Sequence, residues 1–434
     1  MMLMLSMAAR SAWNRRFNLL LMLLAIAMSV AMLLGVERIR HAVRASFAQS
    51  VSGTDLVVGA RTSPIQLMLY TVFHLGGATN NMRWDSVERL ARHPAVAWTI
   101  PLSLGDSHRG FPVLATTASY FTHYRYGDRR ALELAQGRIF PSLFDAVLGA
   151  EVASRLGYRV GDRIVLSHGD SGDSGDSGDD GPHADPAGDH DHADKPFVVS
   201  GILARTGTPV DRTVHIGLDA MQAIHLGWEG GAPLPGLAIL PEQVRKFDLT
   251  PHSVTGVLVG LKLRSQVFAV QREIAEDPHE PLTAALPGVA LDDLWRVIGV
   301  AERAMLLVSA LVVVVGLAGL ASSILAALGE RRRELAILRA VGARPRDLLA
   351  MLALEGLVVM AAGALLGLLL LSTLAAGLGP YLEATYGVAL QAAWPTPGEW
   401  PLLVAAVAAG FCVSLLPGWR AYRLSLADGL MPTT

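Results

Sequence analysis

A stretch of histidine and aspartate between residues 168 and 195 carries the most distinctive chemistry in the sequence. It runs from a Gly-Asp-Ser repeat into a His/Asp tract, with four histidines and nine aspartates in all. Imidazole and carboxylate groups suit divalent transition metals such as Zn²⁺, Ni²⁺ and Cu²⁺. His190-Asp191-His192 places three such groups within reach of one ion. We therefore predict a zinc-type site with the candidate ligands His168, His183, Asp189, His190, Asp191 and His192.

The same stretch is also typical of a solvated loop, and the sequence leaves both interpretations open. It contains almost no apolar residue, so it cannot bury a core, and we expect disorder over 168–195. Its spacing matches no closed structural zinc site. The single cysteine, Cys412, excludes an internal disulfide and a multi-cysteine zinc site. Zinc at this loop is therefore the only cofactor that the sequence suggests for the chain itself.

Other residues that could do chemistry form no catalytic group. Asp106-Ser107-His108-Arg109 has the residue types of a hydrolase triad, but adjacent positions do not place them in line, so we expect a polar loop. We expect His215 and His225 to be ordinary domain residues. No G-x-x-x-x-G-K-[ST] phosphate loop occurs in the sequence. The prediction is a non-enzyme with no catalytic residues, and a net charge of −2 gives no signal for nucleic acid.

Four segments are long and apolar enough to cross a bilayer, which takes about 20 residues each. The first is followed by Glu37-Arg38-Ile39-Arg40 and by no cleavage site, so we interpret it as an uncleaved span and not as a signal peptide. The predicted fold is a membrane protein whose four transmembrane helices carry a large α+β extracytoplasmic domain between helices 1 and 2. The predicted spans are 17–36, 304–328, 348–376 and 400–419.

The distribution of arginine predicts the orientation of these spans. Arginines cluster in 1–16, in 330–346 and in 420–434, whereas 377–399 has no Lys or Arg. Positive charge marks the cytoplasmic side, so both termini are predicted to be cytoplasmic, and 377–399 is predicted to be an outer loop. Within the spans, Gly316, Gly319, Gly363 and Gly367 are candidates for close helix packing.

The predicted outer domain, 40–298, alternates short strands and helices. We expect strands at 55–59 and 257–261, and a helix over 84–93. The runs 163–166 and 197–199 are predicted to pair as a hairpin, with the His/Asp stretch as its loop.

Between the second and third spans, residues 330–346 read ERRRELAILRAVGARPR. Leu335, Leu338 and Val341 recur at a spacing of three, which predicts a short helix with an apolar side and a charged side. Gly342 suits the left-handed position after the helix, and Pro345 suits the first turn of the next one. A cytoplasmic helix of this kind is suited to binding a soluble partner.

This run resembles the core of FtsX-like permease domains. Glu334, Leu338, Arg339, Ala340 and Gly342 match the segment that couples the family to its ATPase, and Glu355 matches a glutamate near the start of the third span. The tail resembles the family's closing motif at Pro417, Arg420 and Ala421. The outer region is similar to the MacB-type periplasmic domain, and the matching positions are Gly137-Arg138, Gly149, Leu156-Gly157 and Gly161-Asp162.

The resemblance implies a permease subunit of the bacterial inner membrane, arranged as in the LolC/LolE and FtsX proteins. A separate cytoplasmic ABC ATPase would bind ATP and Mg²⁺, and a second permease copy would complete a homo- or heterodimer in the lipid bilayer. The implied coupling residues are Glu330, Arg331, Arg332, Arg333, Glu334, Leu335, Leu338, Arg339 and Gly342.

Three functions stay open on this basis. One is export or release of lipoproteins, peptides or other periplasmic substrates by mechanotransmission, with a periplasmic partner protein where the system has one. The second is a metal-linked accessory system that uses the His/Asp loop. The third is regulation of cell-wall hydrolases. Neighbouring genes would distinguish them, because each function implies a different companion protein.

Overall fold

The computed structural model describes residues 16–50, 52–168, 192, 194–229, 232–233, 241–330, 337, 340–342, 344–386 and 395–423. The chain divides into two compact units. One unit consists of Met1–Val43 and Ile298–Thr434, and the other, the inserted domain, is Arg44–Val297.

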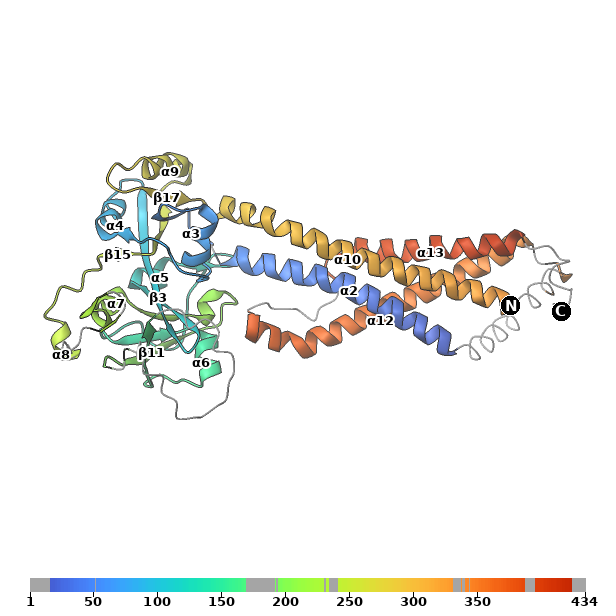
Figure 1. The fold of residues 1–434 in the computed structure, drawn as a ribbon, viewed down its shortest axis with the longest axis horizontal. Helices are drawn as coiled ribbons and strands as arrows, with labels where there is room; N and C mark the ends of the chain where they lie inside the picture. Colours follow the sequence, from blue (N-terminus) through green and yellow to red (C-terminus); the bar gives the residue numbers. More distant parts are fainter. Residues whose placement is uncertain are drawn as a thin grey trace. The chain divides into compact units, whose positions relative to one another are not determined.

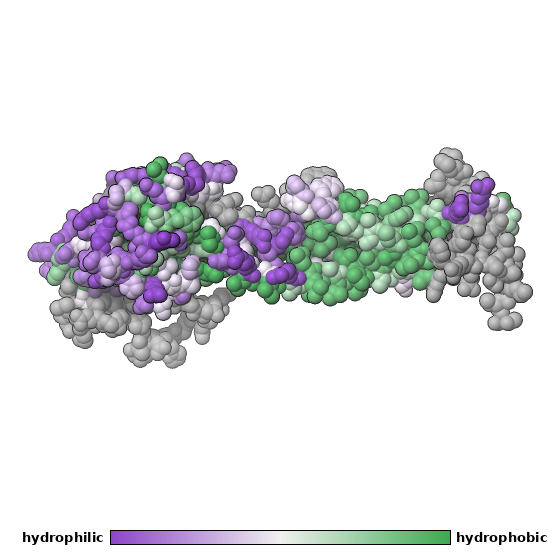
Figure 2. Space-filling model, turned by 90° about the horizontal axis from the view of Figure 1, so that it is seen from above, coloured by the Kyte–Doolittle hydropathy of each residue, from purple (hydrophilic) through white to green (hydrophobic). Residues whose placement is uncertain are grey.

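Four helices are long and apolar enough to cross a membrane, and they run side by side in Figure 1. Each is longer than the span predicted within it. Their outward side chains are apolar, which gives these helices the broad green surface in Figure 2. The predicted fold class is confirmed: four apolar helices, with an α+β domain between the first and the second. The helices are α2 (Arg16–Gln49), α10 (Pro287–Glu330), α12 (Pro345–Tyr386) and α13 (Glu399–Arg423).

Glycines bring these helices close together. A Cβ atom added to Gly363 of α12 would lie 2.5 Å from Ile26 Cγ2 of α2, and one added to Gly367 would lie 2.6 Å from the Ala27 carbonyl oxygen. In lipid, small residues of this kind let helix backbones approach. The packing of α12 on α2 therefore requires glycine at both positions.

The two candidate glycines of α10 differ from each other. A Cβ atom added to Gly316 would lie 2.9 Å from Ser29 Oγ of α2, whereas one added to Gly319 would have no described atom within 4 Å. Gly316 thus lies in a helix contact. Gly319 meets no described neighbour in this chain, so its role in helix packing stays a prediction.

A buried ion pair joins α2 to the start of α13. Arg38 Nε lies 2.9 Å from Glu399 Oε1, and the two side chains are 7% and 1% exposed. Glu399 also accepts a hydrogen bond from the Thr396 amide. Removing one partner of such a pair leaves a buried charge uncompensated, so each partner depends on the other. Glu399, predicted to end the outer loop, is the first residue of α13.

Among the described residues, eleven strands form the main sheet of the inserted domain. Its order is β17-β1-β16-β3-β4-β12-β8-β11-β7, with β10 paired to β3 and β9 paired to β11. Most pairs are antiparallel, but β12 runs parallel to β4, and β11 runs parallel to β8. The strands are β1 (Leu56–Ala60), β3 (Val96–His108), β4 (Phe111–Thr116), β7 (Leu134–Gly137), β8 (Asp145–Leu148), β9 (Arg163–Ile164), β10 (Ser167–His168), β11 (Phe197–Leu203), β12 (Val214–Gly217), β16 (Gly256–Leu261) and β17 (Leu282–Ala285).

Both faces of this sheet are covered. Successive side chains of a strand point to opposite faces, and in β1 Leu56 and Val58 belong to one apolar cluster while Val57 belongs to the other. The covering helices are α3 (Pro64–Thr71), α4 (Trp84–Ala91), α5 (Ala118–His123), α6 (Ala150–Leu156), α7 (Leu218–Ile224) and α9 (Val267–Ala275). The domain also contains the short helix α8 (Pro241–Val244) and the 3₁₀ turns η1 (Pro209–Arg212) and η2 (Arg264–Gln266). Three short ladders complete the domain: β2 (Met82–Arg83) with β15 (Ser253–Val254), β5 (Arg125–Tyr126) with β6 (Arg130–Ala131), and β13 (Trp228–Glu229) with β14 (Ala232–Pro233).

Several local predictions are confirmed. The strands expected at 55–59 and 257–261 correspond to β1 and β16, and the helix expected over 84–93 corresponds to α4. The predicted hairpin is present, with Phe197 opposite Ile164 in the β9–β11 ladder.

The polar loop expected at residues 106–109 is wrong. Asp106, Ser107 and His108 end strand β3 and are buried. Only Arg109 and Gly110 form the turn to β4, and both have positive φ angles, 48° and 79°. Two-residue hairpin turns with positive φ at both positions match the natural twist of paired strands. The polar residue types suggested a loop, but the strand continues to the turn itself.

His215 of β12 is a buried histidine with an acid-sensitive environment. Its ring lies 5.3 Å from that of Tyr120 and is fully buried. The pKa of His215 is lowered to about 3: burial is the main cause, the nearby His74 adds to it, and the Val147 carbonyl that accepts from Nδ1 opposes both. The neutral ring therefore suits this site, and the protonated ring does not.

We expect acid to destabilise the inserted domain through His215. Its folded-state pKa lies below its unfolded value, so stability is complete above about pH 6.5 and falls as the pH is lowered. The expected loss by about pH 5 is about 2 kcal/mol. In thermal unfolding of the detergent-purified chain, His215→Leu should remove this part of the pH dependence, and the exposed control His252→Asn should not. An unchanged pH dependence in His215→Leu would contradict the assignment.

The glycine contacts predict opposite effects of two equal substitutions. Gly367→Ala should lower the free energy of unfolding by on the order of 1–3 kcal/mol, because the new methyl group meets backbone of α2. Gly319→Ala should be neutral or stabilising by up to about 1 kcal/mol, because alanine favours helix and the site is open. Unfolding midpoints in detergent measure both, and equal midpoints for the two variants would refute the packing.

Candidate functional site

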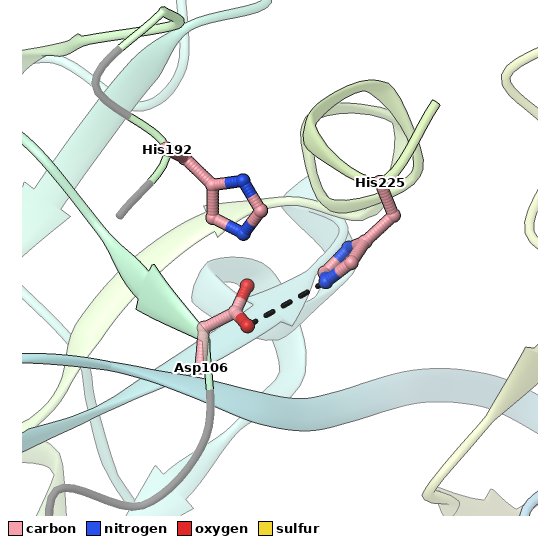
Figure 3. A group of neighbouring side chains, drawn as sticks. All are labelled: Asp106, His192 and His225. Carbon is pink, nitrogen blue, oxygen red and sulfur yellow. Dashed lines mark ion pairs between the residues drawn. The ribbon is translucent and has the colours of Figure 1, made fainter. Parts of the chain in front are cut away.

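Three metal-ligating side chains from distant parts of the sequence meet in the inserted domain. Asp106 comes from β3, His225 follows the last residue of α7, and His192 lies between β10 and β11. Figure 3 shows the three side chains pointing toward one another. We refer to Asp106, His192 and His225 as the His/Asp centre.

The His/Asp centre is compact and largely shielded from water. Each residue offers one ligand atom within 4.8 Å of those of the other two. His225 Nε2 lies 3.6 Å from Asp106 Oδ1, and the two imidazole rings lie 5.2 Å apart at 76°. His192 and Asp106 are buried, and the His225 side chain is 27% exposed.

Local structure explains why each side chain points inward. In the β3–β4 ladder Leu104 pairs with Leu114 and Asp106 with Val113, so Gly105 is an extra residue. A bulge of this kind redirects the following side chains, and Asp106 is buried directly after it. The His192 amide donates to the Leu166 carbonyl at 2.9 Å, and the His192 carbonyl accepts from the Lys195 amide at 3.1 Å. These bonds hold the end of the β10–β11 connection against the domain.

His225 is oriented by the helix that precedes it. Its Nδ1 lies 2.8 Å from the Met221 carbonyl, which is one of the last carbonyls of α7. A carbonyl only accepts, so Nδ1 carries the proton of this bond. In the neutral ring Nε2 then carries a lone pair, and this is the nitrogen that faces Asp106.

The centre also has a defined charge balance. Burial lowers the pKa of His225, but the Asp106 carboxylate and the Met221 carbonyl outweigh it, so the pKa is raised above 6.5 despite the opposing charge of Lys195. Lys195 is buried and pairs with Asp194 at 2.8 Å. This pair offsets part of the positive charge of Lys195, and Asp106 supplies the negative charge of the centre.

The predicted metal residues have different outcomes. His192 belongs to the centre. The β10 backbone places His168 directly opposite Asp106 in the ladder. His183, Asp189, His190 and Asp191 lie outside the described residues, so their role stays a prediction.

Asp106 and His225 are the members that sequence reasoning missed. His225 was expected to be an ordinary domain residue, and Asp106 was expected to lie in a loop. The only local signal was the spacing of Leu218, Met221 and Ile224, which predicts a helix with His225 at its end, where a side chain caps the last carbonyls. The meeting with His192 depends on strand order and leaves no local signal.

The segment between α10 and α12 is described in part. Glu330 is the last residue of α10. Arg331, Arg332, Arg333, Glu334, Leu335, Leu338 and Arg339 lie outside the described residues.

The described end of this segment is a helical turn that terminates at Gly342. The Val341 amide donates to the Ile337 carbonyl at 3.0 Å, and Gly342 has a φ of 105°. The Arg344 amide donates to Asp347 Oδ2, and α12 begins at Pro345. Ile337 and Val341 lie one turn apart on one helix face, and they are 56% and 83% exposed. The turn therefore presents an apolar pair between two membrane helices.

Both halves of the chain match known families. The model of the MacB-like periplasmic core domain matches residues 17–277, which is more than half of the chain. The model of the FtsX-like permease C-terminal domain matches residues 306–426. The chain belongs to the MacB/FtsX-type ABC-transporter permeases. The family and the four apolar helices together make this permease a multi-pass inner-membrane protein.

Solved structures are similar to the permease at low sequence identity. The periplasmic region of MacB from Actinobacillus actinomycetemcomitans is 9% identical and has a TM-score of 0.32, and the match covers 56% of this chain and 94% of that one. The extracellular domain of the noncanonic ABC-type transporter YknZ from Gram-positive bacteria is 10% identical and has a TM-score of 0.29, with 53% and 98% covered. No curated protein is significantly similar to the chain.

Proposed function

We propose that this permease couples ATP hydrolysis on a separate cytoplasmic ATPase to a conformational change of its inserted domain. The observation that carries the proposal is the helical turn that ends at Gly342. It lies between two membrane helices, exposes Ile337 and Val341, and follows a run of arginines. We take this apolar pair, next to the charged run, as part of the surface that binds the ATPase.

The arginine distribution supports an orientation for this coupling. Segments 1–16, 330–346 and 420–434 hold the clustered arginines, and positive charge favours the cytoplasm. The turn at Gly342 would then face the ATPase, and the inserted domain would lie in the periplasm. ATP and Mg²⁺ would bind on the partner, because the printed sequence has no phosphate-loop motif.

Helix packing supports a route for the coupling. α12 begins three residues after Gly342, and its glycines pack against α2 at Ile26 and Ala27. α2 and α10 are each one uninterrupted helix that contains residues of both units. With two permease copies on two ATPases, closure of the ATPases would move the paired segments and, through these helices, the inserted domains. The inserted domains would thus switch between two states, and nucleotide bound at the remote ATPases would shift the balance between these states.

The substrate class that fits this mechanism lies outside the cytoplasm. We propose release or export of a lipoprotein, peptide or other periplasmic or membrane substrate, with force transmitted to the inserted domain. The His/Asp centre favours a second candidate, a metal-linked accessory system, because two imidazoles and a carboxylate meet in that domain.

We expect two substitutions in the coupling segment to uncouple the ATPase. Gly342→Val places a branched side chain at a φ of 105°, which strains the stop between the two helices. Glu334→Arg reverses the charge at the position that matches the family's coupling motif. Both variants should insert normally, and both should lose most of the permease-stimulated ATPase rate measured with the cognate ATPase in nanodiscs.

Gly299→Val is the matched control, since an added Cβ at this position of α10 would meet no described atom within 4 Å. It should keep the wild-type stimulation. If Gly342→Val and Glu334→Arg also keep it, the assignment of this segment as the coupling surface fails.

A further inference from the structure

We propose that Asp106, His192 and His225 bind one Zn²⁺ ion in the inserted domain. The bound ion would fasten the end of the β10–β11 connection to β3 and to α7. This inference deepens the metal-linked candidate function. Its test measures binding directly, so its failure is distinguishable from a failure of ATPase coupling.

The geometry is close to what zinc requires. A tetrahedral ion with Zn–N and Zn–O bonds of about 2.1 Å holds its ligand atoms about 3.4 Å apart. His225 Nε2 and Asp106 Oδ1 are already 3.6 Å apart, and a ligand atom of His192 lies within 4.8 Å of both. Small side-chain rotations would therefore bring all three atoms to bonding distance.

The second contact of His225 matches that of a metal-bound histidine. Histidine ligands of metals usually donate their other ring N–H to a carbonyl or carboxylate, which fixes the tautomer and the ring orientation. The Met221 carbonyl accepts from His225 Nδ1 in this way at 2.8 Å. The nitrogen that remains, Nε2, points to the space shared with Asp106 and His192 (Figure 3).

Charge and burial suit a divalent cation. Asp106 contributes one negative charge, and neutral imidazoles contribute none, so the ion would leave the centre with one net positive charge. The positive charge of Lys195 is partly offset by Asp194 at 2.8 Å. Burial of Asp106 and His192 excludes competing water, which strengthens the attraction between ion and carboxylate.

The ligand set indicates the class of ion and its coordination. Two imidazoles with one carboxylate suit Zn²⁺ better than Mg²⁺ or Ca²⁺, which prefer oxygen ligands. Three protein ligands leave a fourth position for water or a further donor, as in zinc sites that exchange a ligand. An ion at this centre would join segments that are distant in the sequence.

The test is a Zn²⁺ titration of the detergent-purified full chain against a chromophoric chelator. Wild type should bind one ion with micromolar or tighter affinity, and Mg²⁺ at the same concentration should not compete. Asp106→Asn and His225→Asn should each weaken this binding by more than about 100-fold, the upper range of losses caused by second-shell changes. His252→Asn, an exposed histidine of the same domain, is the matched control and should bind as wild type does.

A second pair of variants distinguishes ion binding at the His/Asp centre from ion binding by the His/Asp stretch that precedes it in the sequence. Replacement of residues 169–190 by a short Gly/Ser linker keeps His192 and should preserve the tight binding of one Zn²⁺ ion. His192→Cys in a Cys412→Ser background should bind Co²⁺ with a thiolate-to-cobalt charge-transfer band, which only direct ligation produces. Unfolding midpoints without metal show whether each variant is folded.

The outcomes decide between the centre and its alternatives. The proposal would be overturned if the linker variant lost tight Zn²⁺ binding while folded Asp106→Asn and His225→Asn retained it. The metal would then be assigned to the His/Asp stretch itself. Absence of tight binding in the wild type would also overturn it, and the centre would be a buried His–Asp ion pair. A folded His192→Cys variant without the charge-transfer band would exclude His192 as a ligand.

Discussion

The contact of α12 with α2 through Gly363 and Gly367 is the constraint on which the membrane unit depends. In lipid no hydrophobic effect drives one apolar helix against another, so close backbone approach must supply the attraction. At Gly367 the Ala27 carbonyl leaves no room for even a methyl group. The two helices are therefore held at one separation and one register. The same contact joins the helix that begins after Gly342 to the helix that leads into the inserted domain, so it lies on the proposed route of coupling.

A second constraint acts inside the inserted domain. The main sheet buries both faces, so a polar side chain that points inward needs a polar partner. His215 meets this need as a neutral ring whose Nδ1 donates to a carbonyl, and Asp106 meets it beside His225. The bulge at Gly105 positions Asp106, and the end of α7 positions His225. These two side chains therefore meet His192 and form a compact group of three metal-ligating residues. As a zinc site, this group would respond to a divalent ion, whereas the proposed coupling surface would respond to nucleotide on a partner. The permease would then have two separate places at which its state is biased.

The sequence predicts the membrane unit well because hydropathy reports it directly. Each of the four apolar runs forms a helix, and the left-handed Gly342 and the start of α12 at Pro345 follow from local conformational preferences. Strands such as β1 and β16 are also readable from short apolar runs. The strand order is not readable, because β12 between β4 and β8 results from contacts between distant segments. For the same reason the His/Asp tract indicated metal chemistry and His192, but gave no indication of Asp106 or His225. At Gly319 the sequence alone does not distinguish a packing glycine from an open one, since a small residue in a span does not by itself imply a neighbouring helix.

In the proposed mechanism, nucleotide on a separate ATPase moves the inserted domains of a permease pair. The distance between two spin labels on the complex in nanodiscs measures this movement. The label would be placed at the exposed Asp248, as Asp248→Cys in a Cys412→Ser background, one on each copy. We expect the distance distribution to shift when a non-hydrolysable ATP analogue replaces the nucleotide-free state, and to return when the analogue is removed. An active complex that hydrolyses ATP while the distribution stays the same in both states would exclude this movement of the inserted domains.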